Sequence, residues 1–338
     1  ARVWAREQRF RIGVQLLRRL AHPREAGRAY TAVAEAVLTT LWPYIVAETE
    51  SRLGPAPGQG AAVLSLGKAG SREMTATSDL DLIVVYDADP AETAPGQTRA
   101  AASWYARLTQ TLVAALSAPT AEGALYDVDM RLRPSGRQGP VAVSWKSFED
   151  YQRDRAWTWE HLALTRARPL AGEPALIERL SATITEVLAA PRNRDATLSD
   201  VRDMRARIDE AAADVSPWDP KSGPGRLLEI ELALQTARLL TPGIDERAPA
   251  EMIDPLATAG VLSTAEAAHL TEAHGRLVAV QQLTRAALDG AYDPERGGAG
   301  LAALLADLCG VADSAALKAK LAADAEMSAA IVTRLLRV

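Results

Sequence analysis

The segment from Gly67 to Asp81 constrains the fold most, because it joins two apolar stretches through a turn that contains two glycines. Residues 61–66 predict a short buried strand, and residues 79–86, which begin Asp-Leu-Asp, predict a second strand. Alternation along a strand places Asp79 and Asp81 on one face. Two carboxylates that repel each other suit a divalent cation, and Mg²⁺ is commonly held by such carboxylates together with substrate phosphates. The simpler alternative is a turn with two solvated strand-end aspartates.

The glycine turn itself indicates an anion contact. Gly67 and Gly70 permit close approach to the backbone, Ser71 adds a hydroxyl, and the N–H groups of such a turn form an anion-binding nest. No Gly-Lys-Ser/Thr closes the turn, and the next strand follows too soon for a dinucleotide fingerprint. Gly-Ser, a short spacer and Asp-x-Asp at a strand start resemble the signature of the nucleotidyltransferase superfamily.

A third strand is predicted over residues 124–134, where polar and apolar side chains alternate strictly. If this strand pairs with residues 79–86, it adds a further carboxylate and two guanidinium groups, whose planar forks suit phosphate oxygens. The alternative is a surface strand with cross-strand ion pairs. The polar side chains of this strand are Asp127, Asp129, Arg131 and Arg133.

The rest of the chain is predicted to be mostly helical. A strand at 141–144 completes a small α+β unit, a surface loop is expected at 87–96, and the C-terminal part resembles a helical bundle in its periodicity. A glycine-rich loop at 297–300 is expected to join its last two helices. Helices are expected over residues 1–20, 23–53, 98–116, 147–168, 174–188, 198–212, from 226, 263–288 and 312–336.

Composition narrows the class of protein. The 338 residues are 48% hydrophobic, which supports a sizeable core, and the net charge of −5 without a basic tract disfavours nucleic-acid binding. The single cysteine, Cys309, excludes a disulfide framework and a cysteine-rich zinc site. No long apolar run and no signal peptide are recognisable, so we expect a cytoplasmic protein without a membrane partner.

Four motifs stand along the chain: 67–73 with 78–82, 126–136, 156–161 with 166–168, and 219–221 with 223, 225, 229–231 and 235. Together they resemble one family, glutamine synthetase adenylyltransferase. Family members are bifunctional, with two homologous nucleotidyltransferase halves: one attaches AMP from ATP to a tyrosine of glutamine synthetase, and the other removes it by phosphorolysis. The resemblance implies a polymerase-β-like, mixed-sheet catalytic domain at 56–170, helices at 1–55 that pack on it, and a helical bundle domain at 171–338.

The resemblance also implies a direction for the reaction. The Pro134-Ser135-Gly136 run and the run from Trp157 to His161 are similar to the C-terminal, adenylylating half, and 338 residues are too few for both halves. We therefore expect an adenylyltransferase portion that releases pyrophosphate. Phosphorolytic removal of AMP and a non-catalytic nucleotide-binding regulatory module are the alternatives. Glutamine synthetase, the PII signal protein and the effector glutamine are the implied partners.

Site residues follow from the same resemblance. Three aspartates are expected to hold two Mg²⁺ ions: Asp79, Asp81 and Asp129, the last preferred to Asp127 and also helping to deprotonate the target tyrosine. ATP is the expected substrate, with its phosphates contacted by Lys68, Gly70, Ser71, Arg131 and Arg133. Supporting roles around these groups are expected for Glu160, Lys221 and Glu231.

Three further residues have two interpretations each. Glu229 stands where the family usually has the shorter aspartate, which leaves its positional role open. Trp157 is expected in the core, the alternative being a contact with nucleotide or target tyrosine. His161 is expected to make a structural hydrogen bond rather than to act as a general base.

Overall fold

The computed structural model describes residues 1–88, 97–211, 215–294 and 297–337. The chain forms two compact units, one made of Ala1–Phe10, Tyr30–Met74 and Ser78–Ala190, the other of Arg11–Ala29, Thr75–Thr77 and Pro191–Val338. The functional division that we expected at residues 55 and 170 stays a prediction.

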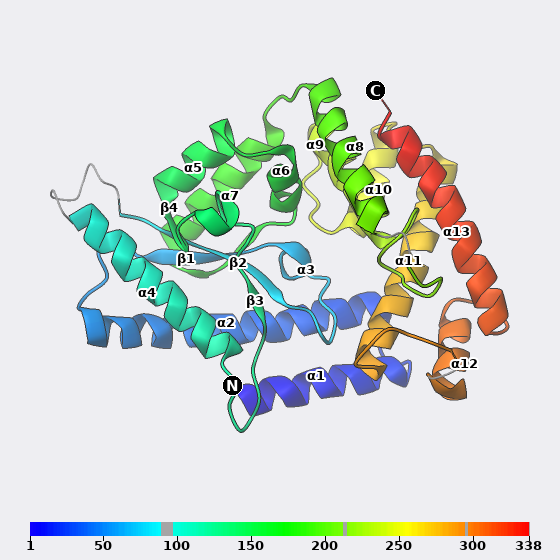
Figure 1. The fold of residues 1–338 in the computed structure, drawn as a ribbon, viewed down its shortest axis with the longest axis horizontal. Helices are drawn as coiled ribbons and strands as arrows, with labels where there is room; N and C mark the ends of the chain where they lie inside the picture. Colours follow the sequence, from blue (N-terminus) through cyan, green and yellow to red (C-terminus); the bar gives the residue numbers. More distant parts are fainter. Residues whose placement is uncertain (89–96, 212–214, 295–296, 338) are drawn as a thin grey trace. The chain divides into compact units, whose positions relative to one another are not determined.

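A five-stranded mixed sheet organises the first unit (Figure 1). Strand β1 is antiparallel to both β2 and β5, whereas β2 is parallel to β3 and β4. The order is β3-β2-β1-β5, with β4 pairing with β2 outside this path. This sheet, followed by helices, confirms the α+β class. The strands are β1 Ala61–Ser65, β2 Leu80–Tyr86, β3 Val128–Asp129, β4 Ala142–Ser144 and β5 Arg168–Gly172.

Both faces of the central strands are buried, which is why β1 and β2 are almost continuously apolar. On one face Leu64, Ile83 and Val85 pack into a core with helices α5, α6 and α7. On the other face the ring of Tyr86 stacks on Tyr105 of α4, with 4.4 Å between ring centroids. The helices that contribute to this unit are α1 Arg2–Leu17, α2 Pro23–Leu53, α3 Gly67–Gly70, α4 Gln97–Ser117, α5 Trp145–Asp154, α6 Thr158–Leu164 and α7 Pro174–Ala189.

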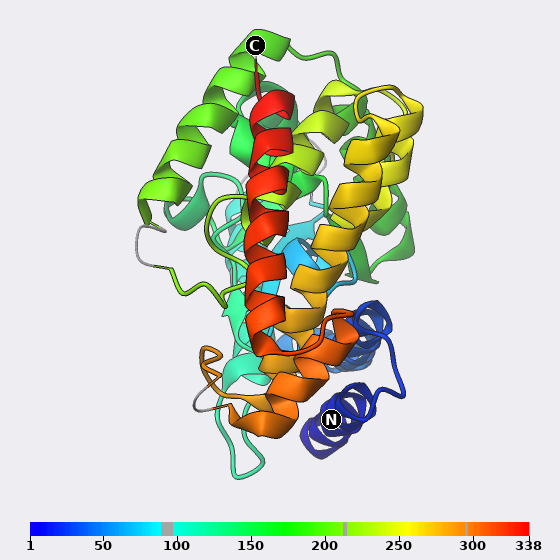
Figure 2. The ribbon, with the colours of Figure 1, turned by 90° about the vertical axis from the view of Figure 1, so that its right-hand side faces the viewer.

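The second unit is helical, as its periodicity predicted. Helices α11 and α13 lie side by side (Figure 2), and the guanidinium of Arg276 holds both carboxylate oxygens of Asp324 at 2.6 and 3.0 Å. Among the described residues, none of the helices is long and apolar enough to cross a bilayer. The helices are α8 Arg194–Ala211, α9 Leu227–Leu240, α10 Pro249–Thr258, α11 Thr264–Ala287, α12 Gly298–Leu308 and α13 Ser314–Leu335.

The structure corrects several element predictions. The strand expected over 124–134 is only two residues long, because the chain turns into a loop after Asp129. The helix expected up to residue 168 breaks at 155–157, and its end is replaced by strand β5, which pairs with β1. The glycine-rich segment from residue 298 begins α12. The loop predicted at 87–96 lies, from residue 89 on, outside the described residues.

Candidate active site

Parallel pairing of β2 with β3 brings two of the predicted carboxylates together. Asp81 is the register partner of Asp129, and the N–H of Leu80 donates to the carbonyl of Asp127 at 2.9 Å. Asp79 immediately precedes β2 and is exposed. Burial, followed by the charges of Asp79 and Asp129, raises the pKa of Asp81 to about 6. The three aspartates therefore share one electrostatic site.

The glycine turn supports the Asp81 carboxylate directly. Gly67 has a φ of +53°, and a Cβ built on it would lie 2.1 Å from Oδ2 of Asp81. Two features therefore disfavour a side chain at position 67: the left-handed backbone and the contact with the Asp81 carboxylate. This contact explains why the motif has a glycine at position 67 and an aspartate fourteen residues later, at position 81.

The turn is a single helical turn, α3, that closes on itself. The N–H of Ser71 donates to the carbonyl of Gly67 at 3.2 Å, and that of Glu73 donates to the carbonyl of Lys68 at 2.8 Å. The hydroxyl of Ser71 lies 2.7 Å from Oε2 of Glu73. A Cβ on Gly70 would lie 2.0 Å from the carbonyl oxygen of Arg166, so Gly70 serves close packing within the chain. Phosphate contacts by Lys68, Gly70 and Ser71 stay a prediction.

Asp129 is held by its neighbour Arg131. The backbone N–H of Arg131 donates to Oδ1 at 2.8 Å, and its Nε donates to Oδ2 at 2.6 Å. These hydrogen bonds, the one from the guanidinium above all, hold the pKa of Asp129 below its ordinary value in spite of partial burial. The carboxylate is therefore ionised near neutral pH and is engaged by Arg131.

Arg133 shapes the loop that follows β3. Its side chain is buried, and its guanidinium donates to the carbonyls of Met130 at 2.8 Å, of Arg137 at 3.3 Å and of Gly139 at 3.2 and 3.3 Å. Four donors of the fork are thus used on the backbone of the loop. The phosphate contact predicted for Arg133 stays a prediction. In the structure the Arg133 side chain holds the loop together.

Glu160 caps helix α6. Its carboxylate, 4% exposed, accepts from the N–H of Trp157 at 2.9 Å and from the hydroxyl of Tyr151 at 3.0 Å. Burial raises its pKa, against these two hydrogen bonds. The core position expected for Trp157 is wrong, because its side chain is 68% exposed. His161 makes a hydrogen bond of the kind expected, since its Nε2 lies 2.8 Å from the carbonyl of Gln152, and its structural role stays a prediction.

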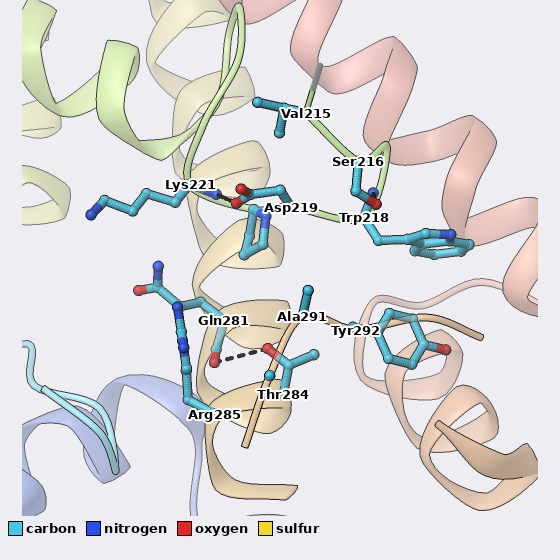
Figure 3. A pocket seen from close by; sticks show the side chains of 12 residues that line it. Val215, Ser216, Trp218, Asp219, Lys221, Gln281, Thr284, Arg285, Ala291 and Tyr292 are labelled. Atoms are coloured by element: carbon cyan, nitrogen blue, oxygen red, sulfur yellow. Dashed lines mark hydrogen bonds between the residues drawn. The ribbon is translucent and has the colours of Figure 1, made fainter. Parts of the chain in front are cut away.

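Two predicted supporting residues belong to the second unit. Lys221 lines a pocket of about 390 Å³, where it extends with Gln281 and Arg285 toward one side, opposite the rings of Trp218 and Tyr292 (Figure 3).

In the same unit, Oε1 of Glu231 lies 3.9 Å from Nε2 of the buried His274. Glu229 is fully buried and accepts from Nε of Arg205 at 2.6 Å and from the N–H of Gly225 at 2.7 Å. Through the contact with Gly225, Glu229 holds the loop before α9.

The sequence interpretation missed two arginines of the first unit. The charge of Arg166, which is 9% exposed, lowers the pKa of Asp81 against the effect of burial. Arg168 donates from Nη2 to the carbonyl of Ala69 at 3.1 Å and from Nε to that of Gly70 at 3.2 Å. In the sequence analysis these two arginines appear within the Arg166-Ala167-Arg168 run of a family motif, and no role was predicted for either of them.

The donor set fits a divalent cation in charge and chemistry, because hard carboxylate oxygens that repel each other are what Mg²⁺ prefers. Within the part of the chain that the structure describes, however, no three acidic, histidine or cysteine side chains are arranged to hold a metal. The hydrogen bonds from Arg131 turn the Asp129 carboxylate toward that guanidinium. In this conformation the Asp129 carboxylate is engaged by Arg131 rather than grouped with the other two aspartates.

Comparison with known proteins gives the family. The family model of glutamate-ammonia ligase adenylyltransferase matches residues 1–183, which is more than half of the chain. The chain belongs to this family. The match includes both strands with the paired aspartates, the glycine turn and strand β5.

Similar proteins carry the name bifunctional glutamine synthetase adenylyltransferase/adenylyl-removing enzyme. The one from Caulobacter vibrioides is 44% identical over 341 residues, which cover 98% of this chain and 34% of that protein. The one from Agrobacterium fabrum is 42% identical over 310 residues, with 89% and 31% covered. That from Brucella suis is 42% identical over 322 residues, with 92% and 32% covered. This chain spans about a third of the length of these relatives.

Proposed function

We propose that this chain transfers AMP from ATP to a tyrosine of glutamine synthetase and releases pyrophosphate. The observation that carries the proposal is the pairing of Asp81 with Asp129 across β2 and β3, with the Asp81 carboxylate resting on Gly67 of the glycine turn. A cation-binding pair of carboxylates beside a phosphate-binding turn is what nucleotidyl transfer needs. Family membership supports this assignment, and the names of the relatives supply the target.

In the proposed reaction the tyrosine oxygen forms a bond to the α-phosphorus while the bond from that phosphorus to the bridging oxygen breaks, and pyrophosphate leaves with the electron pair. Asp79, Asp81 and Asp129 would hold Mg²⁺, which when bound neutralises phosphate charge. Asp129, once released by Arg131, takes up the phenolic proton. The freed guanidinium of Arg131 then faces the charge that develops on the phosphate oxygens.

Binding of ATP is assigned to the glycine turn. Lys68 and Gly70 of α3, together with Ser71 directly after it, would contact the β- and γ-phosphates. The resemblance of the Pro134-Ser135-Gly136 run and of residues 157–161 to the adenylylating half favours transfer over removal. The PII protein and glutamine are proposed as regulators, and residues 56–170 as the catalytic part.

The test combines the two directions of the reaction. The chain is mixed with glutamine synthetase and ATP labelled at the α-phosphate, and in a second arm with adenylylated synthetase and inorganic phosphate. We expect label on the synthetase and pyrophosphate release that depends on the synthetase. Efficient ADP formation in the second arm, without transfer in the first, would assign the chain to the removing reaction. Binding of Mg·ATP without either reaction would indicate a regulatory module.

A further inference from the structure

The carboxyl-terminal end of helix α3 is held from strand β5. Arg168 donates to the carbonyls of Ala69 and Gly70 at 3.1 and 3.2 Å, two of the last carbonyls of the helical turn. The turn's own closing bond from the N–H of Arg72 to the carbonyl of Ala69 is long, at 3.4 Å. A cation at this end also complements the partial negative charge of the helix carbonyls.

Helix α2 in turn fixes Arg168. Glu35 of α2 forms an ion pair with the guanidinium of Arg168, and its Oε1 also lies 3.3 Å from Nε of Arg72. One helical turn earlier, the hydroxyl of Thr31 accepts from the N–H of Met74 at 3.3 Å. Arg168 and Glu35 are largely buried, at 17% and 24% side-chain exposure, whereas Arg72 is 58% exposed, so the Arg168 pair is screened less by solvent and salt.

An isolated helical turn is not stable, because fixing its residues yields too few hydrogen bonds to offset the lost entropy. The conformation of α3 therefore depends on groups outside it. We propose that Arg168, braced by Glu35, is a positioning residue that fixes the glycine turn for the β- and γ-phosphates of ATP. This inference rests on the proposed function, since it needs ATP as the ligand of that turn.

The proposal predicts a selective kinetic effect. Loss of the Arg168 fork should raise KM for ATP about tenfold, equivalent to about 1.4 kcal/mol, while kcat falls less than about threefold and KM for glutamine synthetase stays unchanged. Arg168→Lys should rescue this loss only in part, because a point charge cannot hold two carbonyls as the planar fork does. A merely structural role would lower the melting temperature and leave both KM values unchanged.

The experiment uses the whole chain with Arg168→Gln, Arg168→Lys and Glu35→Gln, the last in case Arg168→Gln fails to fold. The control is Arg72→Gln, which removes the exposed ion pair to Glu35 and keeps a side chain of similar length at the same left-handed position, φ +62°. Amide hydrogen exchange of residues 67–74 is measured without nucleotide, and steady-state kinetics are measured with ATP and glutamine synthetase.

Faster exchange of the turn together with a higher KM for ATP, in the Arg168 and Glu35 variants and not in the control, would support the inference. With an active wild type, unchanged exchange or an unchanged KM for ATP in Arg168→Gln and Glu35→Gln would overturn it and leave the proposed function intact. A wild-type chain that transfers no AMP in either direction would instead refute the proposed function.

Discussion

Gly67→Ala tests whether the glycine turn positions Asp81. The added Cβ would lie 2.1 Å from Oδ2 and 3.1 Å from Cγ of Asp81, whereas real Cβ atoms essentially never approach closer than 3.0 Å, so the carboxylate must move by roughly 1 Å. Misplacement of a catalytic group by about 1 Å costs on the order of a hundredfold in rate. The left-handed backbone adds about 1–2 kcal/mol of destabilisation, since alanine pays a steric cost that glycine does not.

A matched control separates these two effects. Gly123 of the same unit has a φ of +78° and open space where its Cβ would be, so Gly123→Ala carries the backbone cost alone. We expect both variants to lose about 1–2 kcal/mol of unfolding free energy, measured in urea, but only Gly67→Ala to lose about a hundredfold in kcat/KM for AMP transfer. Equal activities of the two variants would refute the claim that the turn supports Asp81.

Three further predictions concern single residues. Asp81→Asn should keep the fold and lower AMP transfer about a thousandfold or more, and near-normal turnover would contradict the site. Burial opposes ionisation of Asp324, but hydrogen bonds from Arg276 and Lys320 hold the pKa of this carboxyl below the ordinary 3.8. The ionised carboxylate therefore contributes its full stabilisation above pH 3.8, and this contribution is lost as the pH falls below that value. Asp324→Asn should therefore cost about 3 kcal/mol near neutral pH and weaken the acid dependence of unfolding, which an unchanged acid slope would disprove. Trp157→Phe should leave the melting temperature within about 1 °C, because the indole is exposed, and lower kcat/KM about tenfold; the opposite pattern would argue for a packing role.

The sequence predicts the central part of the sheet well. Residues 61–65 and 80–86 are nearly all apolar and bounded by glycine and polar residues, so local pattern and tertiary burial agree for β1 and β2. The sequence suggested that the strand with Asp127 and Asp129 could pair with residues 79–86, and only the family resemblance favoured Asp129, the register partner of Asp81.

The misses arise where side chains bind backbone far away in the sequence. Alternation predicted a long strand at 124–134, but Arg133 closes the chain into a loop through carbonyls of residues 130, 137 and 139. Strand β5 contains Pro169 and Gly172, which local propensity does not favour, and it exists because β1 offers a free edge. Glu229 and Arg168 have roles that depend on partners in other elements, which no local pattern reveals.

Mass spectrometry of glutamine synthetase after incubation with this chain, ATP and Mg²⁺ tests the central claim most directly. We predict one adenylyl group on a tyrosine of the synthetase with the wild-type chain. With Asp81→Asn its rate of formation should fall about a thousandfold or more, and with Mg²⁺ removed by a chelator none should form. An unmodified synthetase, or one that carries a phosphoryl group instead of AMP, would contradict the account.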